Sequence, residues 1–259
     1  MRIAENYRVP GFTANSVHTG IKTDGGKDLS LIFSTHPAAA AGVFTTNCFK
    51  AAPVLLDQQR IRSGAAQAVI ANSGVANAAT GPEGLADARA MSRFTSAALG
   101  IADDLVLVAS TGVIGHRLPV HKIETGIKGL VAGLHKDGIP DAEAGIMTTD
   151  RFPKIAVRKG SIGGKEVTLC GIAKGAGMIQ PNMATMLAFV MTDAAIETNL
   201  LDQVFRRSIA GSFNAISVDG CMSTNDTALI LSNGVAGNPL LRRGSANVTR
   251  FRELLSDLL

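Results

Sequence analysis

The stretch Lys174–Met191, "KGAGMIQPNMATMLAFVM", joins a glycine-rich segment to a run of apolar residues. Two glycines and a proline precede a single hydroxyl, that of Thr185, which begins the run "TMLAFVM". A continuous apolar run of this length, bounded by turn residues, predicts a buried strand. A threonine that opens a strand usually reflects β propensity. The position of Thr185 at the start of a strand therefore does not by itself indicate a catalytic role.

The composition is that of a globular chain with an ample core. Of the 259 residues, 46% are hydrophobic and 18% are charged, which fits one large domain or two small ones. Aromatic residues make up only 4%, and the charges that give a net +4 are scattered, so we expect no nucleic-acid partner. No apolar run approaches a membrane span, and the first residues lack the apolar core of a signal peptide. We therefore expect a cytoplasmic protein without a membrane partner.

Cysteine and histidine have no pattern that indicates a metal or a disulfide. The three cysteines, Cys48, Cys170 and Cys221, include no CxxC pair, which favours a reducing compartment. The five histidines show no HExxH spacing, and no GxSxG or P-loop motif occurs. We expect no metal and no bound cofactor. An enzyme built on this sequence would work without an obvious histidine base.

Apolar runs of strand length alternate with helical patterns along the chain. The pattern predicts helices over 84–100, 121–134 and 198–213, strands over 67–72, 104–110 and 227–234, and a hairpin over 154–172 that turns at Gly163–Gly164. This alternation indicates an α/β fold, with sheets covered by helices.

Three polar stretches that contain glycine stand beside predicted strands. They are "NSGVANAATG" (72–81), "STGVIG" (110–115) and the stretch that approaches Thr185. Taken singly, each is more simply explained as a turn, because Gly and Asn after a strand usually serve backbone with positive φ. A functional interpretation requires that they act together.

A threonine can act as a nucleophile without histidine if its own α-amino group becomes the base. Thr185 would then have to become an N-terminus, by cleavage between Ala184 and Thr185. An N-to-O acyl shift, in which the Thr185 hydroxyl attacks the preceding carbonyl, would suit this flexible approach. The reaction needs an oxyanion hole, for which Thr111 and Gly112 of "STGVIG" are candidates.

Five motifs occur in order along the chain: "NSGVANAATG", "STGVIG", "GIMTTD" (145–150), "AKGAGMIQPNMATMLAFVMTDA" (173–194) and "SFNAISVDGCMSTNDT" (212–227). Together they resemble the ornithine acetyltransferase family, the bifunctional glutamate N-acetyltransferases of arginine biosynthesis. The resemblance runs from residue 41 to residue 227. It implies that Thr185 is the nucleophile freed by self-cleavage and that Thr111 and Gly112 form the oxyanion hole. It also implies that Thr148 and Lys174 contact the substrate.

The same resemblance implies an architecture and a reaction. The fold would be a sandwich of sheets covered by helices, with residues 1–184 as the first chain and residues 185–259 as the start of an incomplete second one. An acetyl group would pass from N-acetylornithine to Thr185 and then to glutamate, without a cofactor. Acetyl-CoA remains open as a second donor. The cleaved pairs would assemble into an oligomer.

The sequence departs from the family in two places. Cys221 and Met222 stand where an acidic and a small polar residue are expected, and we assign Cys221 no role. The sequence also stops at "FRELLSDLL", inside an amphipathic pattern, whereas the family continues through further substrate contacts. Two alternatives therefore stay open. One is an amidohydrolase or aminopeptidase with an N-terminal nucleophile, which would release the acyl group to water. The other is an inactive fragment that lacks the C-terminal substrate site.

Overall fold

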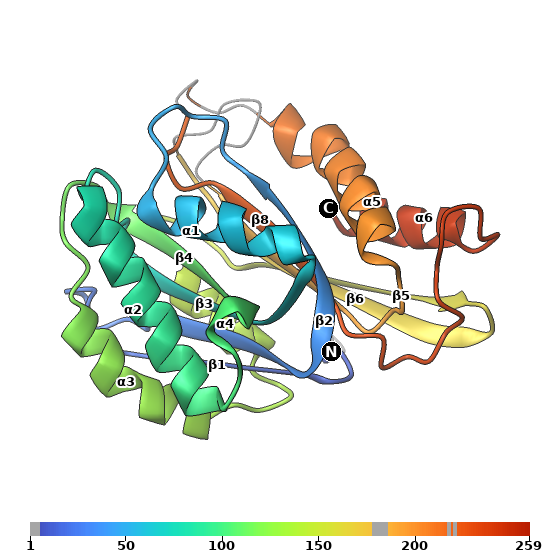
Figure 1. The fold of residues 1–259 in the computed structure, drawn as a ribbon, viewed down its shortest axis with the longest axis horizontal. Coiled ribbons are helices and arrows are strands. Elements are labelled where there is room, and N and C mark those ends of the chain that lie inside the picture. Colours follow the sequence, from blue (N-terminus) through green and yellow to red (C-terminus); the bar gives the residue numbers. More distant parts are fainter. Residues whose placement is uncertain (1–5, 178–185, 217–218, 220–221) are drawn as a thin grey trace.

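The computed structural model describes residues 6–177, 186–216, 219 and 222–259. The strands in these ranges are β1 (Phe12–Val17), β2 (Leu29–Phe44), β3 (Ala65–Val75), β4 (Val106–Val113), β5 (Lys154–Ile162), β6 (Lys165–Lys174), β7 (Leu187–Thr192) and β8 (Thr227–Ser232). They form one eight-stranded sheet in the order β4-β3-β2-β8-β7-β6-β5, and β1 pairs with β2 beside this path (Figure 1).

The long strand β2 divides this sheet into two halves. Its first part pairs with β1 and β3, and its last six residues pair with β8, from Ala39↔Ser232 to Phe44↔Thr227. The register against β3 shifts between Phe33 and Ala38. Pro37 lies in this interval, where a residue without a backbone N–H removes no regular ladder bond. The β2 strand therefore belongs to both halves and connects them at an irregularity.

The two halves pack face to face over one hydrophobic core. Alternate residues of the strands in both halves meet in a single buried cluster: Val69, Ala71, Leu107 and Ala109 from β3 and β4, with Cys170, Ile172, Leu187, Phe189, Met191, Leu229 and Leu231 from β6, β7 and β8. Helix α4 (Ile139–Ile146) adds side chains to the same cluster. The predicted α/β sandwich is therefore confirmed, and its two layers belong to one continuous sheet.

Helices cover the outer face of each half. Helices α1 (Ala52–Arg60), α2 (Gly81–Leu99) and α3 (Val120–Ala132) pack on the half that contains β3 and β4, and α5 (Thr198–Gly211) and α6 (Val248–Leu258) on the other (Figure 1). The strand residues out of phase with the inner core face these helices, for example Ile70 of β3 and Val190 of β7. The result is a four-layer α/β/β/α arrangement.

The elements expected from periodicity occur at their predicted places. The predicted helices match α2, α3 and α5, and the predicted strands match β3, β4 and β8. The hairpin β5–β6 turns at Gly163 and Gly164, whose φ angles are 59° and 79°. The run "TMLAFVM" forms β7 from Leu187 onward. Ala184 and Thr185 lie outside the described residues, and so does Cys221.

Candidate active site

The candidate site lies where the ends of strands from the two halves come together. Thr111 and Gly112 are near the end of β4, and Lys174 is the last residue of β6. The Lys174 ammonium donates a hydrogen bond to Thr111 Oγ1, with a distance of 3.0 Å. Lys174 is also paired in register with Leu187, the first residue of β7. Residues far apart in the sequence are thus neighbours at the start of the strand that follows Thr185.

Gly112 is a glycine for a steric reason. Its φ is +133°, and a Cβ built there would lie 2.2 Å from the carbonyl carbon of Gly74, its register partner on β3. Gly74 itself has φ of +105°. Backbone in this region favours glycine because other residues clash. The close approach of β3 and β4 accounts for Gly112, whereas a Cβ on Gly74 would meet Ile21, at 3.1 Å from its side chain.

Lys174 carries its charge in a buried place. The residue is 3% exposed, and the only hydrogen bond that its ammonium makes with the described part of the chain is the one to Thr111. Burial lowers the pKa of Lys174, against the attraction of the Asp150 carboxylate. An ammonium has three donors. Lys174 is therefore a buried cation with donors to spare, which favours a negatively charged or carbonyl-bearing ligand.

Asp150 ties the loop that carries Thr148 to the end of β6. Its Oδ1 accepts the Gly175 N–H and the Lys154 ammonium, both at 2.7 Å, and its Oδ2 accepts the Thr148 N–H at 3.2 Å. Burial would raise the pKa of Asp150, but these hydrogen bonds outweigh it and the pKa lies below its ordinary value. The sequence analysis missed this role, although Asp150 closes the quoted motif "GIMTTD".

A cavity of about 530 Å³ brings the predicted substrate contacts together. Its lining includes Thr111, Gly112, Thr148 and Lys174, together with Lys22, Asp24, Gly74, Val113, Thr149, Ala176 and Gly177. The Lys22 ammonium donates to the carbonyls of Lys27 and Met147, at 2.9 and 2.7 Å. All four predicted site residues that the structure describes therefore face one cavity, and Lys22 is a cation there that sequence reasoning missed.

A smaller cavity on the other side of Thr111 and Gly112 reaches the residue after Thr185. Its volume is about 50 Å³, and its lining includes Met186 and the first three residues of the motif "STNDT", Ser223, Thr224 and Asn225. The Asn225 amide donates to the carbonyls of Ala76 and Ser110, at 2.6 and 2.9 Å. The last motif of the resemblance thus fixes the backbone on which Thr111 stands.

Comparison with known proteins decides the family. A sequence model of the ArgJ family matches residues 13–259. The chain belongs to the ArgJ family. It is 55% identical over 251 residues to the arginine biosynthesis bifunctional protein ArgJ of Geobacter sulfurreducens, and 50% identical to that of Symbiobacterium thermophilum. These alignments cover 97% and 96% of this chain but only 64% and 62% of the relatives, so the chain spans less than two thirds of their length.

Solved structures agree with this assignment. The ArgJ protein of Bacillus halodurans superposes with a TM-score of 0.64 at 41% identity, over 68% of this chain and 92% of the solved one. The ornithine acetyltransferase of Mycobacterium tuberculosis, solved in complex with ornithine, gives a TM-score of 0.62 at 40% identity, over 72% and 98%. An aminopeptidase of Ochrobactrum anthropi, a variant of the Ntn hydrolase fold, gives 0.59 at 12% identity, which shows a shared fold alone.

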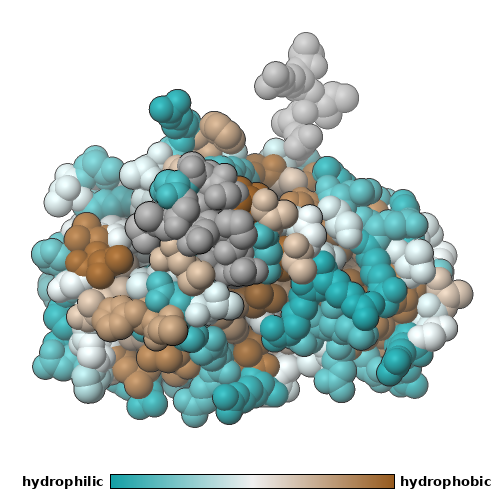
Figure 2. Space-filling view, turned by 90° about the horizontal axis from the view of Figure 1, so that it is seen from above, coloured by the Kyte–Doolittle hydropathy of each residue, from teal (hydrophilic) through white to brown (hydrophobic). Residues whose placement is uncertain are grey.

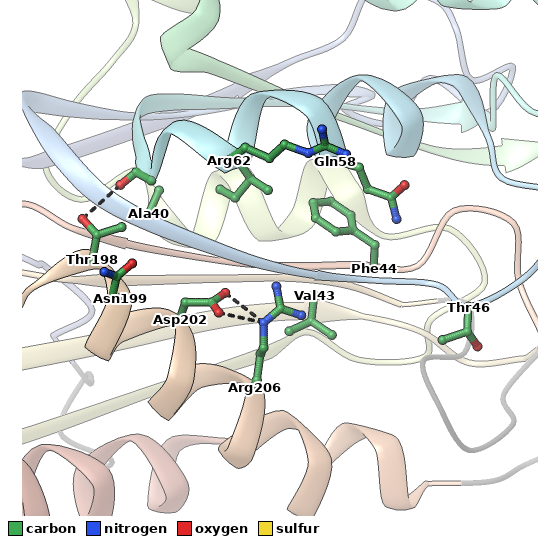
Figure 3. A pocket seen from close by; sticks show the side chains of 12 residues that line it. Ala40, Val43, Phe44, Thr46, Gln58, Arg62, Thr198, Asn199, Asp202 and Arg206 are labelled. Carbon is green, nitrogen blue, oxygen red and sulfur yellow. Dashed lines mark hydrogen bonds and ion pairs between the residues drawn. The ribbon is translucent and has the colours of Figure 1, made fainter.

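A cavity larger than the one at Lys174 lies away from the predicted residues. It has a volume of about 600 Å³ and opens between β2, α1 and the first turns of α5 (Figure 3). Arg206 and Asp202 pair across i and i+4 at its edge, and Arg62 stands on the opposite side. None of the candidate site residues of this ArgJ-family chain lines it. Volume alone therefore does not indicate the predicted residues, whereas the hydrogen bond between Lys174 and Thr111 brings two of them together.

Two further classes of site find no support in the part of the chain that the structure describes. No cluster of three His, Cys, Asp or Glu side chains is arranged to hold a metal ion there. Among the same residues, no helix has the length and apolar character needed to cross a membrane. On the face seen in Figure 2, hydrophilic and hydrophobic residues are interspersed.

Proposed function

We propose that the protein is an acetyltransferase that moves an acetyl group from N-acetylornithine to glutamate through an acetyl-Thr185 intermediate. The proposal joins family membership, the name of the M. tuberculosis relative and the site geometry. It places the enzyme in arginine biosynthesis, in the cytoplasm, without a bound cofactor. Acetyl-CoA is a further candidate donor.

The observation that carries the proposal is the contact between Lys174 Nζ and Thr111 Oγ1. Because the Thr111 oxygen accepts this bond, its own proton is free to be donated elsewhere. A hydroxyl polarised by a buried cation is a stronger donor to a developing oxyanion. Thr111, with the Gly112 amide beside it, is therefore suited to stabilise the tetrahedral intermediate of acyl transfer.

The cavity beyond this contact suits an amino-acid substrate. The Lys174 ammonium uses one donor on Thr111 and makes no other hydrogen bond with the described residues, and the Thr148 N–H, in the lining of the same cavity, donates to Asp150. A substrate α-carboxylate at this point would pair with a desolvated ammonium, where a charge-assisted hydrogen bond is strong. We assign the cavity of about 530 Å³ to the amino-acid part of donor and acceptor.

We further propose self-cleavage between Ala184 and Thr185, which yields residues 1–184 and 185–259 within one fold. The two ArgJ-family solved chains support this division, because 92% and 98% of them are covered while they match only 68% and 72% of this chain. Residues 1–184 represent a similar share of the 259 residues. We expect the cleaved pairs to assemble into an oligomer.

A second candidate is an amidohydrolase or aminopeptidase with the same nucleophile. The observation that favours it is the shared fold with the aminopeptidases of O. anthropi and Burkholderia, at TM-scores of 0.59 and 0.58. The two candidates differ in one step only. In a transferase the acyl-enzyme reacts with the amine of glutamate, and in a hydrolase it reacts with water.

The test uses the protein at the full length of its curated relatives, supplied with N-acetylornithine that carries an isotopic label in the acetyl group. Intact mass should show one acetyl group on the piece that begins at Thr185, and glutamate should discharge it as labelled N-acetylglutamate. Release of labelled acetate at the same rate with and without glutamate would assign the hydrolase. Failure to acetylate Thr185 would refute both.

A further inference from the structure

Asp226 is a buried carboxyl group beside the residue that follows the proposed cleavage site. The residue is 0% exposed and stands directly before β8. Its Oδ1 accepts the backbone N–H of Met186 at 2.8 Å, and the Met186 carbonyl accepts the N–H of Thr227 at 3.0 Å. Met186 is therefore held at both of its backbone polar atoms.

Hydrogen bonds connect the backbone around Asp226 to Thr45, which follows β2. The Asp226 carbonyl accepts the N–H of Thr45 at 2.9 Å, and the Thr45 hydroxyl donates to the Ser223 carbonyl at 2.7 Å. The second carboxyl oxygen, Oδ2, is buried and makes no hydrogen bond with the described part of the chain. A buried oxygen of this kind costs free energy unless it has a partner. The unpaired Asp226 Oδ2 therefore points to a function of this carboxyl group besides holding Met186.

Covalent structure identifies what lies next to this carboxyl group. The Met186 nitrogen is bonded to the carbonyl carbon of Thr185, so only that carbon and the Thr185 Cα separate it from the Thr185 nitrogen. Thr185 lies outside the described residues, but its covalent linkage to Met186 is known from the sequence. The Asp226 carboxyl group therefore binds an atom that is three covalent bonds from the Thr185 nitrogen.

We propose that Asp226 is the acid–base residue of the self-cleavage, and that it then holds the freed α-amino group of Thr185. The inference rests on the proposed function, because it requires cleavage at Ala184–Thr185. The α-amino group of Thr185 can act as a base only after cleavage, because before cleavage its nitrogen is part of an amide. The cleavage itself therefore needs another base. Asp226 fills this gap.

In the proposed step, the Asp226 carboxylate accepts the proton of the Thr185 hydroxyl as the hydroxyl oxygen bonds to the Ala184 carbonyl carbon. The bond between that carbon and the Thr185 nitrogen then breaks, and the nitrogen takes the proton from Asp226. The product is an ester between Ala184 and the Thr185 oxygen, with a free amine. Water hydrolyses the ester, which restores the hydroxyl and leaves Ala184 with a carboxylate.

The ionisation of Asp226 suits this use. Burial raises the pKa of this carboxyl to about 7, although the hydrogen bond from the Met186 N–H, the nearby Ser223 side chain and the charge of Lys174 oppose the rise. Lys174, at the end of β6, is the one charged side chain in the described ranges that acts on it. A group with a pKa near the working pH both accepts and returns a proton readily.

The experiment follows cleavage by intact mass, in protein purified unfolded, at the full length of the curated relatives, and then refolded. Asp226→Asn keeps the shape and an oxygen for the Met186 N–H, and we expect it to slow cleavage by about 10²-fold or more. The wild-type rate should rise as the pH is raised through about 7, because the carboxylate is the active form. Thr185→Ala should stay uncut.

A matched control is Asp193→Asn, at the opposite end of β7. Asp193 is also a buried carboxyl group, 2% exposed, that accepts a backbone N–H, that of Thr168 at 2.8 Å. This variant should cleave at the wild-type rate. If Asp226→Asn cleaves like wild type, or if the wild-type rate is flat through pH 7, the inference is wrong while the proposed function stands. If the wild type never cleaves, both fail. The pH profile needs no variant, so a folding defect of Asp226→Asn leaves the test intact.

Discussion

Replacing Thr111 with valine tests the contact on which the site depends. Valine keeps the branched shape and removes the hydroxyl, so Thr111→Val deletes the proposed oxyanion donor. Loss of one such donor typically lowers kcat about 10²- to 10³-fold, or about 2.7–4 kcal/mol. The change also removes the acceptor of the Lys174 ammonium, which is 3% exposed and has no other hydrogen bond among the described residues.

The second effect can be measured apart from the first. A hydrogen bond to a charged group contributes about 1.5–3 kcal/mol, so Thr111→Val should lower the free energy of unfolding by about that amount near pH 7. Burial already lowers the pKa of Lys174, and loss of the acceptor lowers it further. The charged form is thus more costly in the folded variant. The loss in free energy of unfolding is fully present below the folded pKa of Lys174 in the variant. It shrinks as the pH rises from that value to the folded pKa of Lys174 in wild type.

The assay combines steady-state transfer of acetyl from N-acetylornithine to glutamate with urea unfolding at pH 7 and at higher pH. Thr111→Ser is the control, because serine keeps both the donor and the acceptor, and it should stay within several-fold of wild type. A Thr111→Val enzyme whose kcat remains within a few-fold of wild type would show that the hydroxyl serves the fold alone. The oxyanion assignment would then be refuted.

Three other perturbations test the remaining parts of the site. Asp150→Asn loses the charge that binds Lys154, and should raise KM several-fold more than it lowers kcat, measured by substrate titration. Because the folded pKa of Asp150 is lowered, its contribution to stability is present above the ordinary pKa and is lost as the pH falls through the folded value. Asp150→Asn should therefore have a lower free energy of unfolding than wild type at neutral pH, and the difference should shrink in acid. Gly112→Ala should destabilise the protein by about 1–3 kcal/mol or more in urea unfolding, since its Cβ meets the Gly74 backbone at 2.2 Å, whereas Gly129→Ala meets no atom within 4 Å and should not. The two cleavage products should co-purify under native conditions and separate only in denaturant; separation on a native column would contradict the shared sheet.

The sequence predicted the elements whose periodicity is strong and missed those that tertiary pairing creates. Helix α3 is clear because Ile123, Ile127 and Leu130 share one face, and all three are buried. The β2 strand contains "STHPAAAAG", where alanine and proline are poor strand formers. Strands on both of its sides hold this segment extended, by a pairing that no local window reveals.

The residues around the candidate site also fall into those that the sequence predicted and those that it missed. Thr111 and Gly112 are predicted from the motif "STGVIG" and Thr148 and Lys174 from the family resemblance, and the structure brings all four to one cavity. Residues that act through backbone hydrogen bonds were missed, because their partners are distant in sequence. Asp226 reaches back 40 residues to Met186, and Asn225 reaches back 115 residues to Ser110. Only the folded register of β7 and β8 shows that these side chains contact Met186 and Ser110.

The layout of the sheet sets the order of events in the proposed maturation. Thr111 belongs to one half of the sandwich, and Lys174 and Asp226 belong to the other, so the site exists only after the halves have closed over their common core. The cleavage would therefore follow folding. Pairing across the cut then keeps the pieces together: β6 precedes the cut and pairs with β7 after it, from Leu169↔Thr192 to Lys174↔Leu187. The long β2 strand also precedes the cut, and it pairs with β8, which follows the cut. A break at Ala184–Thr185 thus frees an amino group at the site while both neighbouring ladders continue to hold β7 and β8 in place.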